Sequence, residues 1–293
     1  MTLIVVPQKK NNIDKYYRKK INTFILGLKD FSVNYKCKFS IKDIIKIKNK
    51  YPDVNIFISI DKMIDNCELE ALKGILKEID KIKIKGILFY DNSILQLKEE
   101  LKLSTELVWN NSFCVVNYNA CNYYYDNGCK YALISSEITT NEIVEIKKKT
   151  SMKLMVNVFG YLTMSYSKRK LLTNYFKDIK RIKFKNNYVI TEKSSNIKML
   201  IKEEKAGTIV YRHELLDASK AIFKLLENDI DYFILVEDYI PYSLFNKVLD
   251  KYLLIKDNYK FIEKGKEEKE LSDIIKSGYT GFFQKKTIYK VKK

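Results

Sequence analysis

The sequence predicts a (β/α)₈ barrel, from the number, the composition and the order of its apolar segments. Eight short apolar segments recur along 293 residues, and segments with helical spacing lie between them. The apolar segments alternate little with polar residues, as do strands that are buried on both faces of a parallel sheet. Eight such strands alternating with helices indicate a closed barrel. The predicted strands are residues 3–6, 23–26, 54–60, 86–90, 105–109, 131–135, 153–159 and 231–237.

Helical spacing identifies several of the intervening segments. The apolar face of segment 68–82 comprises Leu69, Leu72, Leu76 and Ile79. Charged residues occupy the opposite face, as in a helix that packs against a core. Segments 141–149 and 216–228 show similar spacing, and Thr139 and Ser40 stand where helices are expected to begin.

The interval between the seventh and eighth predicted strands is long, about 70 residues. Residues 181–193 read as a β-hairpin around Asn186-Asn187, and 207–211 as a further strand. We therefore expect an insertion at about 178–212 on the C-terminal face of the barrel. A tail at about 255–293 begins as helix. With three prolines, nine glycines and no linker-like stretch, residues 1–293 are expected to form a single domain.

The composition points to a globular, reduced, cytoplasmic protein. Hydrophobic residues make up 46% of the chain, as in folded domains. No apolar run approaches the roughly 18 residues that cross a bilayer, and residues 1–10 do not resemble a signal peptide. The five cysteines lack C-x-x-C spacing, so we expect free thiols rather than a zinc or redox site.

The net charge of +18 favours a polyanionic partner, and RNA is the obvious cytoplasmic one. Of the 54 basic residues, however, only four are arginines. Arginine is the better residue for phosphate and base contacts. The alternative is that the lysine excess reflects the composition of an AT-rich genome.

Polar residues at the ends of predicted strands are candidates for a site, because barrel active sites form at the C-terminal ends of strands. These residues are Asp91, Asn110, Asn111, Glu137, Glu237, Asp238 and the stretch 160–169. Asp91, Glu137 and Glu237 could bind a divalent cation or act as acid and base. The alternative for each residue is a solvated or capping role. His213 is the single histidine, so the sequence offers little support for a catalytic triad.

The stretch after Gly160 combines hydroxyl and cationic groups. In one interpretation Arg169 binds a phosphate or carboxylate, and the hydroxyls of Ser165 and Ser167 orient that group. In the other, Ser167 caps the following helix and Arg169 lies in solvent. Lys168, Asn174 and Tyr175 would line the same binding site.

The stretch VFGYLTMSYSKRKLLTNYF (158–176) resembles the signature of the peptidase U32 family. Similar matches occur at TFILGLKDFSVN, ISIDKMIDNCELEAL, GILFYD and NSFCVVNYNACNYYYDNGCKYALISSEITTNEI, and TGFFQKKTIY resembles the end of the short, tRNA-linked branch. The resemblance implies a barrel fold. It implies either peptidase activity, as the family name states, or hydroxylation of tRNA wobble uridine, ribosomal cytidine or ubiquinone precursors.

The chain departs from the signature at positions that bear on cofactors. Phe159 replaces the signature histidine, and Thr163 and Lys170 replace its two cysteines. Some relatives carry an iron–sulfur cluster on four cysteines, but residues 171–293 contain none. No cluster is therefore expected here. A divalent cation stays an open alternative as the cofactor.

Three hypotheses follow from the residues and the resemblance. The first is a factor for tRNA uridine 5-hydroxylation that binds tRNA. The others are a peptidase and a non-catalytic partner of a longer U32 homologue. The predicted catalytic residues are Asp91, Glu137, Ser167 and Arg169. The predicted substrate-binding residues are Asn111, Asn117, Gly160, Ser165, Lys168, Asn174, Tyr175 and Glu237.

Overall fold

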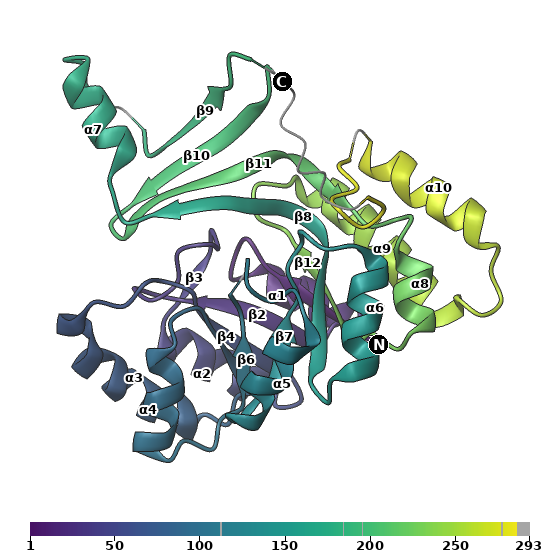
Figure 1. The fold of residues 1–293 in the computed structure, drawn as a ribbon, viewed down its shortest axis with the longest axis horizontal. Helices are drawn as coiled ribbons and strands as arrows, with labels where there is room; N and C mark the ends of the chain where they lie inside the picture. The colour runs from purple at the N-terminus through teal and green to yellow at the C-terminus, as the bar shows by residue number, and fades with distance from the viewer. Residues whose placement is uncertain (112, 184, 195, 277, 286–293) are drawn as a thin grey trace.

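Eight parallel strands close into a barrel, which confirms the predicted fold class (Figure 1). The computed structural model describes residues 1–285 except 112, 184, 195 and 277. Strand β12 pairs with both β8 and β1, and this pairing closes the ring. The barrel strands are β1 (Thr2–Val6), β2 (Thr23–Leu28), β4 (Asn55–Ile60), β5 (Gly86–Phe89), β6 (Leu107–Trp109), β7 (Cys129–Leu133), β8 (Lys153–Ser167) and β12 (Tyr232–Val236).

Alternate residues of each strand fill the barrel interior. The interior cluster includes Ile4, Ile25, Phe57, Leu88, Val108, Tyr131, Met155 and Ile234, one from each strand. The residues between them pack outward against the helices in a larger cluster. Both faces of every strand are therefore buried, which explains why the strands read as continuous apolar runs.

Helices cover the outside of the barrel. They are α1 (Asn12–Arg18), α2 (Ile41–Lys50), α3 (Leu69–Lys81), α4 (Ser93–Leu101), α5 (Tyr118–Asp126), α6 (Thr140–Lys149), α8 (Ile222–Glu227) and α9 (Tyr242–Asn258). Ser40 and Thr139 form capping boxes at the starts of α2 and α6, as expected. The predicted helix at 216–228 is shorter than expected, because residues 216 and 217 end a strand. Two short elements, β3 (Lys38–Phe39) and a 3₁₀ turn (Asn66–Glu68), complete this part.

Strand β8 does not end at the barrel mouth, and residues 160–167 continue it rather than forming the expected loop. Strand β11 (Gly207–Asp217) pairs with this continuation in the antiparallel sense, followed by β10 (Lys198–Glu204) and β9 (Asn187–Thr191). The short helix α7 (Leu171–Asp178) lies between β8 and β9. We call residues 161–215 the arm; it projects over the barrel (Figure 1).

The arm is larger than the predicted hairpin, and its turns lie elsewhere. The Asn186-Asn187 pair does not form the turn of a hairpin, because Asn187 begins β9 and pairs with Lys202 of β10. The described turns join β9 to β10 and β10 to β11.

The predicted tail begins as helix, with α10 (Lys264–Ile275) after α9. Its next part returns to the arm, where the Tyr279 amide donates to the Leu215 carbonyl (2.7 Å) and the Asp217 amide donates to the Tyr279 carbonyl (2.8 Å). The last part of the predicted tail, 286–293, lies outside the described residues. Among the helices that are described, none is long and apolar enough to span a membrane.

Gly160 stands where β8 leaves the barrel. Its φ of +129° lies in a region that disfavours side chains, and a Cβ atom there would lie 2.7 Å from Cβ of Val236. Glycine therefore permits both the backbone conformation and the close approach to β12.

We predict that Gly160→Ala destabilises the protein by roughly 2 kcal/mol or more, because it adds both strain and overlap. Gly74→Ala is the matched control: Gly74 lies within α3, where a Cβ would meet nothing within 4 Å. That change should stabilise by roughly 0.5–1 kcal/mol. Urea unfolding measures both, and an equal effect of the two substitutions would contradict the role of Gly160.

Candidate functional site

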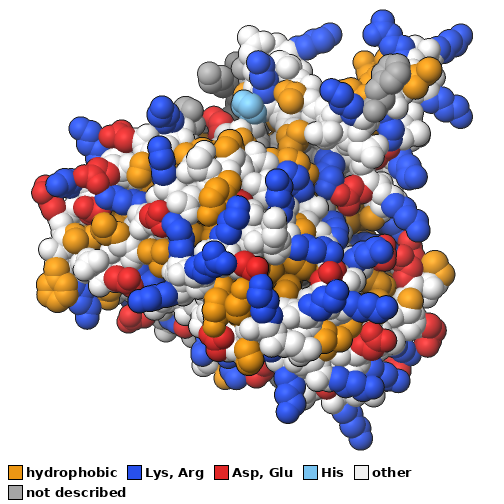
Figure 2. Space-filling model, turned by 180° about the vertical axis from the view of Figure 1, so that it is seen from behind, with side chains coloured by type: hydrophobic (Ala, Val, Ile, Leu, Met, Phe, Trp, Pro, Cys, Tyr) orange, Lys and Arg blue, Asp and Glu red, His pale blue; other side chains and the backbone are white. Residues whose placement is uncertain are grey.

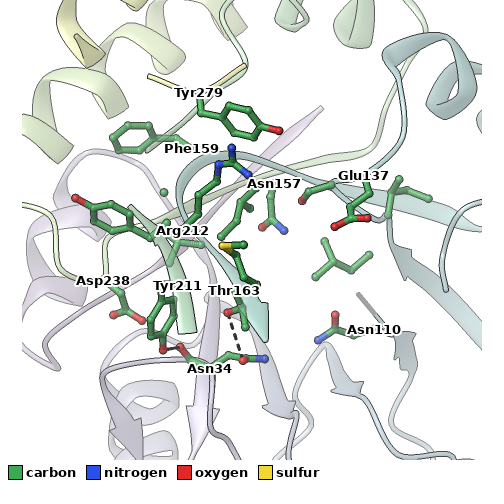
Figure 3. A pocket seen from close by; sticks show the side chains of 18 of the residues that line it. Asn34, Asn110, Glu137, Asn157, Phe159, Thr163, Tyr211, Arg212, Asp238 and Tyr279 are labelled. Atoms are coloured by element: carbon green, nitrogen blue, oxygen red, sulfur yellow. Dashed lines mark hydrogen bonds between the residues drawn. The ribbon is translucent and has the colours of Figure 1, made fainter. Parts of the chain in front are cut away.

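A cavity of about 200 Å³ lies between the barrel mouth and the arm (Figure 3). Its floor comes from the carboxyl ends of the barrel strands. One wall comes from β8 and β11 of the arm, and Tyr279 and Phe282 of the tail add another. Segments from the whole length of the chain therefore meet at this cavity.

Asn110, Asn157 and Asp238 provide the polar groups of the floor. Each continues the inward-facing series of its strand. Asn110 follows Val108 by two residues, and Asn157 follows Met155 by two. The alternation of the strands therefore points these side chains to the barrel axis.

Asp238 is the most unusual group of the floor. It is 2% exposed, and its Oδ2 accepts from the Lys36 amide at 2.7 Å. Its Oδ1 is buried and has no hydrogen-bond partner among the described residues. Burial raises the pKa of Asp238 to about 7, although the Lys36 amide and the nearby Lys38 and Lys202 act in the opposite direction. At neutral pH this carboxyl can therefore donate or accept a proton.

Two further buried polar atoms near the floor lack partners among the described residues. Oδ1 of Asn110 is one, at the side of the cavity away from Asp238 (Figure 3). Nζ of Lys38 is the other, and burial lowers the pKa of that ammonium group. Unsatisfied buried groups are rare in folded proteins and are often explained by a ligand or water.

The arm wall is tied to the barrel by hydrogen bonds. The Tyr211 hydroxyl donates to the Asn34 carbonyl at 2.6 Å, and Thr163 Oγ1 donates to Asn34 Oδ1 at 3.4 Å (Figure 3). Burial raises the pKa of Tyr211 well above its usual value, so it stays a neutral donor. These contacts fix the wall above the floor.

Arg212 links the arm to the tail. Its guanidinium carbon lies 3.5 Å from the centre of the Tyr279 ring, and its Nε–H donates to Glu214 at 3.0 Å. The stacking holds the planar cation at the cavity. Its outer N–H groups have no acceptor among the described residues, so they are available to a ligand.

This arrangement can bind a small group that presents both donors and acceptors. Two amides and a carboxyl of intermediate pKa face an aromatic and guanidinium wall. The volume is below the roughly 300–1,000 Å³ of pockets for drug-sized ligands. It therefore suits one small planar group.

Of the residues predicted as catalytic or substrate-binding, two line the cavity, Glu137 and Gly160. Of the wider set of strand-end candidates, Asn110, Asp238 and residues 161–164 line it as well. Glu137 is exposed at the rim. The three carboxylates considered for a metal or an acid–base pair do not converge. Asp91 accepts from the amides of Ser93 (2.9 Å) and Ile64 (3.2 Å), and Glu237 is buried and accepts from the Gln8 amide (2.9 Å).

The other predicted residues lie outside the cavity. Asn117 is the N-cap of α5, where it accepts from the Ala120 amide (2.8 Å), and Asn111 is half-buried beside the floor. Ser165, Ser167, Lys168 and Arg169 lie on the arm, and Asn174 and Tyr175 lie exposed on α7. Ser167 accepts from the Arg169 amide (3.2 Å) but does not cap α7, and Lys168 forms an ion pair with Asp65.

The alternation of side chains along each strand explains which strand-end residues reach the cavity and which do not. Strand-end residues in phase with the interior series, such as Asn110 and Asp238, reach the cavity. Their neighbours Asn111 and Glu237 are out of phase and point elsewhere. Strand-end position could not identify Tyr211, Arg212 and Tyr279. They reach the cavity through the pairing of the arm with the tail, which joins segments far apart in the sequence.

The cavity offers few metal donors. Among the residues that the structure describes, no group of three or more His, Cys, Asp or Glu side chains is placed to hold a metal ion. Thr163 lies on the cavity where the resemblance places a cysteine, and Lys170 is exposed on the arm. Burial raises the pKa of Cys121 and of Cys129 to about 12, and both pack in the outer core. These donors do not fit a four-thiolate cluster.

We predict that Asp238 makes stability depend on pH. Its folded pKa of about 7 lies above its ordinary value of 3.8, so the folded state keeps a proton that the unfolded chain loses. Stability from this group is full below about pH 4 and is lost as pH rises to 7, by roughly 4 kcal/mol in total.

Asp238→Asn removes this titration. The free energy of unfolding of the variant minus that of the wild type should therefore rise between pH 4 and 7 and stay level above pH 7. Urea unfolding across this range measures the difference, in which the other carboxyl groups cancel. A constant difference would refute the raised pKa.

Comparisons with known proteins identify relatives of this chain. Residues 8–292 match peptidase family U32. The chain is 24% identical to tRNA hydroxylation protein P2 of Bacillus subtilis over 98% of both chains. It is 21% identical to tRNA hydroxylation protein P1 of the same organism over 47% of this chain and 33% of that protein.

Solved structures are more distant. The structure of a U32 peptidase shares 12% identity, with a TM-score of 0.46 over 55% of this chain and 70% of that one. That of 3-hexulose-6-phosphate synthase from Salmonella typhimurium shares 9%, with a TM-score of 0.43 over 94% and 98%. The family match extends over the barrel, the arm and the described tail, and the chain therefore belongs to peptidase family U32.

Proposed function

We propose that this protein acts in the hydroxylation of tRNA uridine and that the cavity receives the base. The observation that carries the proposal is the floor: a buried carboxyl with an unpartnered oxygen, Asp238, lies opposite the unpartnered amide oxygen of Asn110. The full-length likeness to a tRNA hydroxylation protein supports the choice of RNA over peptide.

The edge of a uracil base matches the floor chemically. Its N3–H is a donor, and its two carbonyl oxygens are acceptors. Asn110 and Asn157 can each donate and accept, and Asp238 can do either near neutral pH. The Tyr279–Arg212 stack offers a planar wall of the kind that unpaired bases contact.

We further propose that the chain works without an iron–sulfur cluster of its own, because the thiols it has lie in the outer core or on other surfaces. We also propose a cytoplasmic location, which a role on tRNA supports. The peptidase alternative gains nothing from the geometry of the cavity, since His213 does not line it and instead lines a second pocket.

We predict that a deletion strain loses 5-hydroxylated uridine and its derivatives from bulk tRNA, as measured by nucleoside mass spectrometry. The wild-type gene should restore them, and Asp238→Asn should not. Asp126→Asn is the matched control, because Asp126 is an exposed carboxylate at the end of α5. It should restore them fully.

The other outcomes separate the alternatives. An unchanged nucleoside profile in the deletion strain would overturn the proposal. Loss on deletion with full restoration by Asp238→Asn would mean that the protein acts through a partner, such as a longer U32 homologue, and that its cavity does no chemistry.

A further inference from the structure

We infer that the projecting part of the arm, beyond the residues that wall the cavity, is a docking surface for the backbone of an unpaired RNA segment. The inference rests on the proposed function only in taking tRNA as the RNA. It begins with the charge distribution. The arm holds 13 basic and 5 acidic residues, a net +8 of the +18 of the whole chain, in less than a fifth of its length.

This concentration bears on the origin of the charge. A lysine excess caused by genome composition would spread along the chain. Three of the four arginines, Arg169, Arg181 and Arg212, also fall on the arm. Arginine is the residue that AT-rich codon usage disfavours and phosphate recognition favours.

Most of the basic groups of the arm are free. Lys168, Lys183, Lys202 and Arg212 form ion pairs. Nine others are exposed and have no ion-pair partner among the described residues. They are Arg169, Lys170, Lys177, Lys180, Arg181, Lys185, Lys193, Lys198 and Lys205.

Three of the five acidic groups of the arm form ion pairs with its basic groups, whereas Asp178 and Glu192 are exposed. Glu203 is 3% exposed; it accepts from the Thr173 amide at 2.9 Å and pairs with Lys183 at 2.6 Å. Glu204 pairs with Lys202. These two carboxylates neutralise Lys183 and Lys202, and the nine unpaired basic groups still outnumber the exposed acidic ones, so the arm can attract a polyanion.

The projecting end of the arm also carries aromatic surface. Tyr175 on α7 is 58% exposed, and its ring lies 5.5 Å from that of Phe176, which in turn lies 5.1 Å from that of Tyr188. Exposed tyrosine among lysines provides a stacking surface for unpaired bases, in addition to phosphate contacts. Figure 2 shows lysine, arginine and hydrophobic side chains together at this end.

The arm leads to the cavity. Strands β8 and β11 run from its projecting end to the wall formed by Thr163 and Tyr211. An RNA strand held along the arm would therefore approach the cavity from one side. This placement gives Arg169 and Tyr175 a role in binding at a distance from the chemistry.

The test compares two sets of four substitutions to glutamine. The arm set is Lys177, Lys180, Arg181 and Lys185; the control set is Lys46, Lys77, Lys81 and Lys85, four exposed lysines on and near α2 and α3. Filter binding with an unmodified tRNA transcript across a salt series measures the affinity of each variant for tRNA. The arm set should reduce the slope of log affinity against log salt by about 3, and the control set by less than 1.

A pair of single variants tests the stacking surface. Tyr175→Ala should weaken binding roughly tenfold, and Tyr175→Phe should retain it. If the arm and control sets reduced the salt dependence of tRNA binding equally, the inference would be overturned, because the attraction would then be spread over the whole surface. Tighter binding to anionic phospholipid vesicles than to tRNA would overturn the inference as well. If the arm fails these tests while the deletion strain still lacks hydroxylated uridine, the proposed function stands without this docking surface.

Discussion

The site depends on the passage of one barrel strand beyond the barrel, which the absence of a side chain at Gly160 permits. The backbone there adopts a φ of +129° and touches Val236 of the neighbouring strand. Without this passage β8 would end in a loop, and β11 would have no strand to pair with. The wall containing Tyr211 and Arg212, and the arm beyond it, follow from this one local feature.

Burial of Asp238 is the second constraint, and it opposes stability. A carboxyl whose pKa is raised destabilises the fold once it is ionised. The large apolar barrel interior and outer core offset this loss. Such a group is retained in many proteins where chemistry requires it, and strongly shifted carboxyls concentrate at functional sites.

The sequence predicted the barrel well and the site only in part. Buried parallel strands such as 153–159 and 231–237 are apolar on both faces, so composition alone identifies them. The arm strands have an exposed face and many polar residues, so 160–169 read as a loop. Strand ends can be located from the sequence, but the side of the strand that each polar residue faces is not evident from composition. The prediction therefore places Asn111 and Glu237 among the binding residues and leaves out Asn110 and Asp238. Contacts such as Arg212 with Tyr279 join segments more than 60 residues apart, and no local pattern encodes them.

The joining of the tail to the arm has a consequence for the order of events during synthesis. The barrel can close once β12 has left the ribosome, but the cavity still lacks Tyr279 and Phe282. The tail then pairs with β11 and brings the Tyr279 ring onto Arg212. A nascent chain can therefore hold a closed barrel while its cavity still lacks the wall that the tail provides.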